Sequence, residues 1–128
     1  MIYLDTSVAL AQLFAEDRMP PAGLWRESLV ASRLLEYEMW TRVHSRGIAR
    51  SHGGIVRELL GRVALLELAP EVVARVLDPF PVPVRTLGAL HLATAEFLRS
   101  HGQPVELASY DERMNLAARA LDIPVFSL

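Results

Sequence analysis

Short apolar segments alternate along the chain with longer segments in which apolar residues recur at helical spacing. The short segments predict strands over 1–4, 28–31, 105–109 and 124–128. A further short run, 65–69, is either a strand or a loop between helices. The longer segments predict helices over 6–14, 34–48, 56–65, 71–77, 87–98 and 112–121.

Strands that alternate with helices are connected by right-handed crossovers, which form a parallel sheet covered by helices on both faces. We therefore predict an α/β fold, a three-layer sandwich around a central parallel sheet of four to five strands. The chain has no linker-like Gly/Ser stretch and no repeat of fixed period, so residues 1–128 are expected to form a single domain. The Gly53-Gly54 pair is expected to break a helix pair rather than to separate two domains.

The composition narrows the chemistry that this domain can perform. The 128 residues include no Cys, which excludes disulfide scaffolds, zinc–thiolate sites and thiol nucleophiles. They also include no Lys, which excludes the phosphate-binding Lys of a P-loop and Schiff-base catalysis. The chemistry must therefore come mainly from carboxylates, histidines, hydroxyls or a hard metal ion.

Charge and hydropathy give expectations about partners and location. Thirteen basic and fifteen acidic residues leave a formal charge of −2, so binding to nucleic acid would require a local basic patch. Charged residues interrupt every long hydrophobic stretch, which argues against a membrane-spanning helix. The start, Met1 to Asp5, lacks the basic flank and cleavage site of a secretory signal, so we expect a soluble, cytoplasmic protein.

Three acids fall where strands are predicted to end. Asp5 directly follows the first strand, Asp111 lies two residues beyond the third, and Glu38 lies about one turn into the helix after the second. Ligands of open parallel sheets bind outside the carboxyl ends of the strands, so these carboxylates can converge on one hard divalent cation such as magnesium. The alternative is that Asp5 and Asp111 cap helices and that Glu38 is a surface acid.

Four blocks of sequence carry a resemblance to a known family. They are IYLDTS at 2–7, SRL at 32–34 with Glu38 and Arg42, RTL at 85–87 with ALHLATA at 89–95, and SYDERM at 109–114. In this order and spacing the blocks resemble the PIN-domain ribonucleases, and most closely the VapC-type toxins of bacterial toxin–antitoxin pairs. The resemblance covers nearly the whole chain.

This resemblance implies a function and the residues that perform it. Asp5, Glu38 and Asp111 match metal-site acids, and the hydroxyl residues that flank them are Thr6, Ser7 and Ser109. The implied activity is Mg²⁺- or Mn²⁺-dependent endonucleolytic cleavage of RNA by a metal-activated water, which leaves a 5′-phosphate and a 3′-hydroxyl. The implied partners are a cognate VapB-type antitoxin, whose C-terminal segment occupies a groove on the toxin, and a second copy of the chain in a homodimer.

The chain departs from the family pattern at one position. The family reads Leu-Asp-Ala-Leu-His-Leu-Ala where this chain has Gly88 in place of the Asp, which is one of the principal metal ligands. Gly costs about 1 kcal/mol relative to Ala in a helix interior, and nothing else in the sequence requires a glycine there. The change is natural, or it was introduced to inactivate the protein, or the site is rebuilt around other acids such as Glu112. We predict poor magnesium binding and slow or absent cleavage of RNA, and Gly88→Asp should raise activity.

Two other function classes share part of this pattern. Aspartyl-phosphate phosphatases and receiver domains also begin with a strand that ends in Asp, but they require a second acid nearby and a Lys, which this chain lacks. A catalytically inactive PIN-fold module that sequesters antitoxin or RNA is the stronger alternative, because of Gly88.

The remaining candidates concern arginines, a histidine and a tryptophan. Arg42, Arg46 and Arg50 recur every four residues, so a continuous helix would align them as a phosphate track, although a solvated helix face is the simpler interpretation. Arg85 is expected to contact an RNA phosphate or an acidic residue of the antitoxin, or else to lie on the surface without a specific partner. His91 is expected to be a hydrogen-bonded core residue rather than a zinc ligand, and Trp40 is either core or part of a partner groove.

Overall fold

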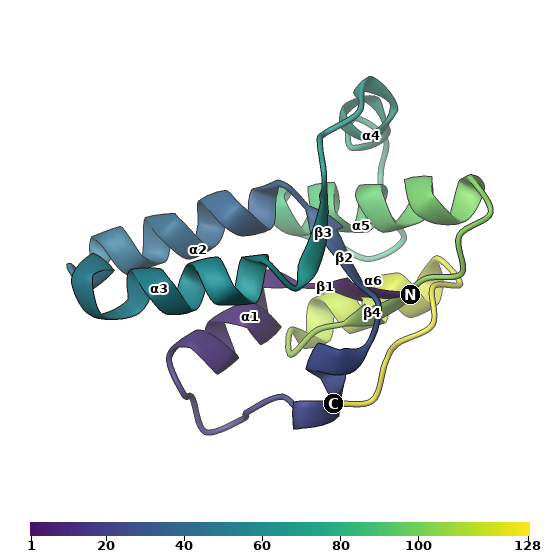
Figure 1. The fold of residues 1–128 in the computed structure, drawn as a ribbon. Helices are drawn as coiled ribbons and strands as arrows, with labels where there is room; N and C mark the ends of the chain where they lie inside the picture. Colours follow the sequence, from purple (N-terminus) through teal and green to yellow (C-terminus); the bar gives the residue numbers. More distant parts are fainter.

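The structure, a computed structural model, describes residues 1–128 and has the predicted α/β architecture (Figure 1). Its strands are β1 (Ile2–Leu4), β2 (Leu29–Ser32), β3 (Val63–Leu66) and β4 (Glu106–Ala108). All neighbouring pairs are parallel, and the strand order is β3-β2-β1-β4. Because β1 lies between β2 and β4, the residue that follows β1 stands in the middle of the sheet edge.

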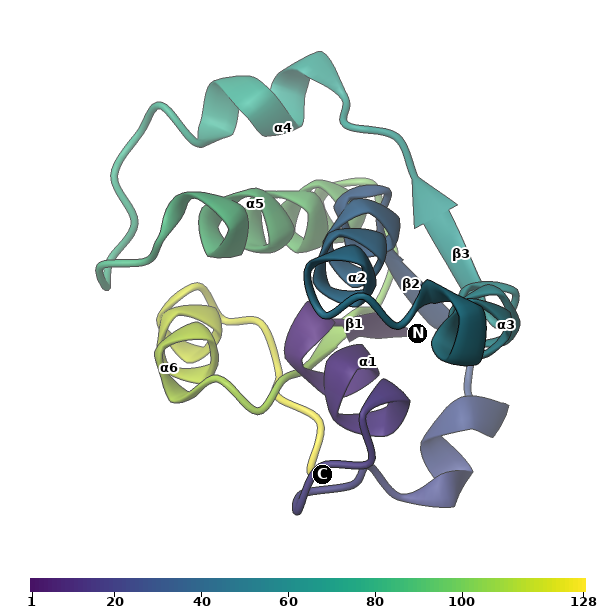
Figure 2. The ribbon, with the colours of Figure 1, turned by 90° about the vertical axis from the view of Figure 1, so that its left-hand side faces the viewer.

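Six α-helices and one 3₁₀ turn surround this sheet. They are α1 (Thr6–Leu13), η1 (Ala22–Arg26), α2 (Leu34–Ser45), α3 (Ala49–Leu60), α4 (Pro70–Arg75), α5 (Thr86–Ser100) and α6 (Glu112–Ala120). Helices α1, α2 and α3 lie on one side of the sheet, and α5 and α6 lie on the other (Figure 2). The short helix α4 lies outside α5, where the Arg75 guanidinium is 3.0 Å from the Glu96 carboxylate.

Two apolar clusters fill the spaces between the layers. Ile2 and Leu4 belong to the cluster under α1, α2 and α3, whereas Tyr3 belongs to the cluster under α5 and α6. This alternation follows from the two-residue period of a strand, which sends successive side chains to opposite faces. The central strand therefore has apolar surface buried on both faces, as the continuous apolar run at the start of the chain predicts.

The structure corrects the prediction of a strand over 124–128. This segment forms only one parallel bridge, in which Val125 pairs with Leu107 at the outer edge of β4. Leu107 donates its backbone N–H to the Pro124 carbonyl and accepts from Phe126. The segment lies at the sheet's edge without a partner on its far side, and the sheet has four strands. Of the ambiguous run 65–69, residues 65 and 66 form the end of strand β3, and the rest is a loop.

The prediction of a helix break at Gly53-Gly54 is wrong. Helix α3 continues through both glycines, and a Cβ at Gly53 would lie 3.3 Å from the Trp40 ring, so the glycine lets α2 and α3 pack closely. The break occurs instead at Gly47, whose φ of +66° suits a glycine that ends a helix. Arg50 therefore belongs to a different helix from Arg42, and the proposed continuous arginine track does not exist.

The helices are also too short or too polar to cross a lipid bilayer.

Candidate functional site

A cleft of about 790 Å³ opens where the carboxyl ends of the central strands meet α5 and α6. All three predicted acids line it. Asp5 follows β1, Glu38 lies one turn into α2, and Asp111 is the N-cap residue of α6. The topology explains this meeting, because β1 is flanked by the two strands that lead to Glu38 and Asp111.

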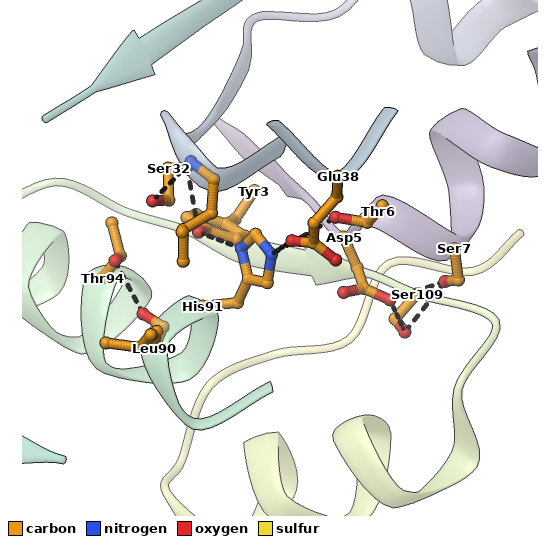
Figure 3. A network of polar contacts seen from close by, with 11 residues as sticks. Tyr3, Asp5, Thr6, Ser7, Ser32, Glu38, Leu90, His91, Thr94 and Ser109 are labelled. Carbon is orange, nitrogen blue, oxygen red and sulfur yellow. Dashed lines mark hydrogen bonds and ion pairs between the residues drawn. The ribbon is translucent and has the colours of Figure 1, made fainter. Parts of the chain in front are cut away.

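Asp5 is oriented by hydroxyl groups rather than by a helix cap. The residue is 6% exposed, and its Oδ2 accepts hydrogen bonds from the hydroxyls of Ser7 at 2.6 Å and Ser109 at 2.7 Å (Figure 3). Its side chain makes no capping bond to α1, although Asp5 occupies the N-cap position. The other oxygen, Oδ1, has no hydrogen-bond partner within the protein. The helix-capping alternative therefore does not describe this carboxylate.

Glu38 is held by a buried histidine. The His91 Nε2 atom lies 2.7 Å from Glu38 Oε1, and His91 is 1% exposed. On the other side of the ring, His91 Nδ1 lies 2.7 Å from the Tyr3 hydroxyl oxygen, which also accepts the backbone N–H of Ser32 (Figure 3). Glu38 Oε2 has no partner within the protein.

The protonation state of Tyr3 determines the direction of this chain of hydrogen bonds. Burial is the main cause that raises the pKa of Tyr3 well above its usual value, so its hydroxyl keeps its proton. With the oxygen accepting from Ser32, the proton is directed to His91 Nδ1. The ring hydrogen then lies on Nε2 and is donated to Glu38. His91 is thus a core residue, as expected, and it also fixes Glu38, which the sequence analysis did not anticipate.

The start of helix α2 is tied to the neighbouring strand by an arginine. Arg33 lies 2.8 Å from a Glu67 carboxylate oxygen and 2.9 Å from a Glu36 carboxylate oxygen. The hydrogen bond to Glu67, and to a smaller extent the one to Glu36, raises the pKa of Arg33. Arg33 thereby connects the first turn of α2 to the residue after β3, and this first turn positions Glu38.

Asp111 serves as a helix cap and still faces the cleft. Its Oδ1 accepts from the backbone N–H groups of Arg113 at 2.9 Å and Met114 at 3.4 Å, as the capping alternative predicts. Its own N–H donates to the Ser109 hydroxyl at 2.9 Å. Oδ2 has no partner within the protein. Ser109 therefore joins Asp5 and Asp111 through one hydroxyl.

The three acids fit a divalent cation only in part. Each is fixed through one oxygen and keeps its second oxygen free of protein hydrogen bonds, and oxygen donors suit magnesium or manganese. However, no three Asp, Glu or His side chains of the chain are arranged to hold one ion. The site fits an ion bound by one or two carboxylates and several waters, and it does not fit a complete three-acid cage.

Gly88 faces the same cleft, from the first turn of α5. A Cβ at this position would lie 2.9 Å from the Met114 sulfur, which is closer than such atoms approach. The buried Met114 side chain occupies the space that a side chain at position 88 would need, and its flexible end would have to shift to admit one. Glu112 also lines the cleft, but it does not complete a metal-binding group.

Arginines surround the acids. Arg42, Arg85 and Arg113 line the cleft, and none of them forms a salt bridge with an acid of the chain. Their charges are therefore available to an anionic ligand, although the same cleft is also lined by Asp5, Glu38, Asp111 and Glu112, so its charge is mixed rather than basic.

Replacement of Ser109 by Ala should destabilise the protein. The change removes one of the two hydroxyl donors to Asp5 Oδ2 and the acceptor for the Asp111 N–H, and two lost hydrogen bonds of about 0.5–1.5 kcal/mol each amount to about 1–3 kcal/mol. We expect urea unfolding to show a loss in this range. Ser100→Ala, at an exposed residue that bonds only to its own last helical turn and to His101, should change the free energy of unfolding much less. Equal losses in the two variants would contradict this interpretation of the site.

Comparisons with known proteins give a matching family model and similar proteins over most of the chain. The family model described as "PIN domain" matches residues 2–120. Ribonuclease VapC46 of Mycobacterium tuberculosis (strain ATCC 25618 / H37Rv) is 32% identical over 133 residues, which cover 98% of this chain and 96% of the relative. Ribonuclease VapC35 of Mycobacterium tuberculosis (strain CDC 1551 / Oshkosh) is 29% identical over 131 residues, which cover 98% of this chain and 95% of the relative.

Proposed function

Because the chain belongs to the PIN-domain family, we propose that it is a VapC-type endoribonuclease toxin with a weakened metal site. The observation that carries this proposal is the meeting of Asp5, Glu38 and Asp111 in one cleft, each with a free carboxylate oxygen. The similarity to two proteins named as VapC ribonucleases, over nearly the full length of each, supports RNA as the substrate.

The residues of the cleft have distinct roles in this proposal. A Mg²⁺ or Mn²⁺ held in the cleft would polarise a water for attack on phosphorus and would neutralise charge that grows on the phosphodiester. Asp5 and Asp111, coupled through Ser109, and Glu38, fixed by His91, are the acids that would hold it. The unpaired guanidinium groups of Arg42 and Arg85 would bind the phosphates on either side of the cleaved bond.

Gly88 weakens this site in two ways. The acid expected at this position is absent, so the negative field that retains a dication is smaller. The space is also filled by the Met114 thioether, which is a poor ligand for a hard ion. We therefore expect weak magnesium binding and slow cleavage.

The proposal includes partners and location. We expect a cognate VapB-type antitoxin, a homodimer and a cytoplasmic location, as for a toxin held inactive until its antitoxin is lost.

Cleavage of a labelled RNA in the presence of Mn²⁺ tests the proposal. We expect slow, metal-dependent cleavage that is abolished by a chelator. Changing a residue that only supports a metal ligand typically lowers activity by roughly 10- to 100-fold. Asp5→Asn changes one of the proposed ligands itself, so it should lower the rate by more than this. The matched control is Asp78→Asn, outside the cleft, which should cleave at the parent rate. Cleavage that persists unchanged in Asp5→Asn would contradict the proposal.

A second candidate is an inactive module that binds RNA or antitoxin. The absence of a three-residue metal group, together with the Met114 side chain in the space beside Gly88, favours it. Binding of RNA without any cleavage, at every manganese concentration tested, would support this module over the enzyme.

A further inference from the structure

A second cleft, of about 610 Å³, adjoins the acidic one. Its lining residues are Ser7, Leu10, Glu16, Asp17, Arg18, Tyr110 and Asp111. Ser7, Leu10 and Asp111 also line the first cleft, so the two clefts share a wall. An RNA strand with one phosphate at the three acids would therefore place an adjacent nucleotide in this second cleft.

The second cleft has a stacking surface next to Asp111. The Arg18 guanidinium carbon lies 5.0 Å from the centroid of the Tyr110 ring. The backbone N–H of Tyr110 donates to the Ser7 hydroxyl at 3.0 Å, which ties this residue to the group that orients Asp5. Unpaired bases of RNA stack on aromatic rings and on arginine planes, so this pair is suited to a single base.

The acids of this cleft indicate which part of a nucleotide it accepts. Glu16 and Asp17 are exposed and form no salt bridge with any basic group of the chain. Ionised carboxylates only accept hydrogen bonds and repel phosphate, so they favour the edge of a base that carries N–H donors. Guanine presents a ring N–H and an amino group on one edge, whereas uracil presents a single N–H.

We propose that this second cleft binds one unpaired base of the RNA, adjacent to the phosphate held at the acids, and prefers guanine. The base stacks on the plane of the Arg18 guanidinium, which lies over the Tyr110 ring, and Glu16 and Asp17 accept from its N–H donors. The position of the base relative to the cleaved bond rests on the proposed function, whereas its binding requires no catalysis.

The test is binding of short fluorescent single-stranded RNAs in the presence of a chelator, followed by anisotropy. The two probes are an oligouridine and the same oligomer with one central guanosine. We expect the full chain to bind the guanosine probe more tightly. Tyr110→Leu should weaken that binding about tenfold, Tyr110→Phe should preserve it, and the exposed control Tyr37→Leu should leave it unchanged.

Exposed-loop variants keep the test independent of folding. Arg18→Met should weaken binding of both probes, and the double variant Glu16→Gln/Asp17→Asn should remove the preference for guanosine. Equal binding of the two probes, or equal effects of Tyr110→Leu and Tyr37→Leu, would overturn the base site. Cleavage in Mn²⁺ is measured separately. Cleavage without any preference for the guanosine probe would support the nuclease function and contradict the base site. Tighter binding of the guanosine probe without cleavage would support the base site and contradict the nuclease function.

Discussion

The double substitution Gly88→Asp/Met114→Ala is expected to raise Mn²⁺-dependent RNA cleavage by at least about tenfold, which corresponds to roughly 1.4 kcal/mol of transition-state stabilisation. Asp at position 88 restores an acid in the first turn of α5, where the helix dipole favours a negative charge. Met114→Ala removes the sulfur that would lie 2.9 Å from the new Cβ. The second change therefore gives the new Asp side chain room without displacing a neighbour.

Each single substitution should be less favourable. Gly88→Asp alone displaces the flexible end of the buried Met114 side chain, so it should raise cleavage, but by less than the double variant. Met114→Ala alone leaves a cavity, which costs about 2–5 kcal/mol for a buried methionine. The double variant should lose less stability than the sum, because the Asp side chain fills part of that cavity.

The control for this prediction is Gly88→Asn/Met114→Ala, which has nearly the same shape without the charge. Cleavage rates in Mn²⁺ and urea unfolding should be measured for the whole set. We expect the Asp variant to exceed both the parent chain and the Asn variant in rate. If the Asp and Asn variants cleave RNA equally, position 88 does not contribute a metal-site acid.

Replacement of His91 by Leu is expected to destabilise the protein and to abolish cleavage. The change leaves Glu38 Oε1 without its donor and the Tyr3 hydroxyl without its acceptor. Each buried polar group left unpaired costs about 1–3 kcal/mol, so the free energy of unfolding should fall by several kcal/mol. Cleavage should fall as well, because Glu38 is no longer held at the cleft.

Two variants separate positioning from folding in this prediction. His91→Gln keeps an N–H donor that can reach Glu38 and should retain part of the activity, whereas His91→Leu should not. His101→Leu, at an exposed histidine after α5, should leave unfolding in urea and cleavage almost unchanged. Equal activity of the Gln and Leu variants, in protein that is folded, would contradict a positioning role for His91.

The sequence predicted what depends on local pattern. Asp5, Glu38 and Asp111 could be placed because each follows a predicted strand, and parallel strands end at a common edge. The structure brings them into one cleft, while their role as metal ligands stays a prediction. The cap at Asp111 was also foreseen as an alternative, since its partners lie two and three residues away.

What the sequence missed depends on contacts between distant segments. The space beside Gly88 is taken by Met114 from another helix, and no local pattern shows this. The His91 hydrogen bonds join residues 3, 38 and 91, which meet only after the sheet has formed. The continuation of α3 through Gly53 likewise depends on the Trp40 ring of the preceding helix.

Direct measurement of Mn²⁺ binding by electron paramagnetic resonance tests the metal site most sharply, because it does not depend on the RNA chosen. For the parent chain we predict weak binding that Asp5→Asn removes and that Gly88→Asp/Met114→Ala strengthens. Binding that is unaffected by Asp5→Asn would show that manganese lies elsewhere on the protein and would contradict a metal site at these acids.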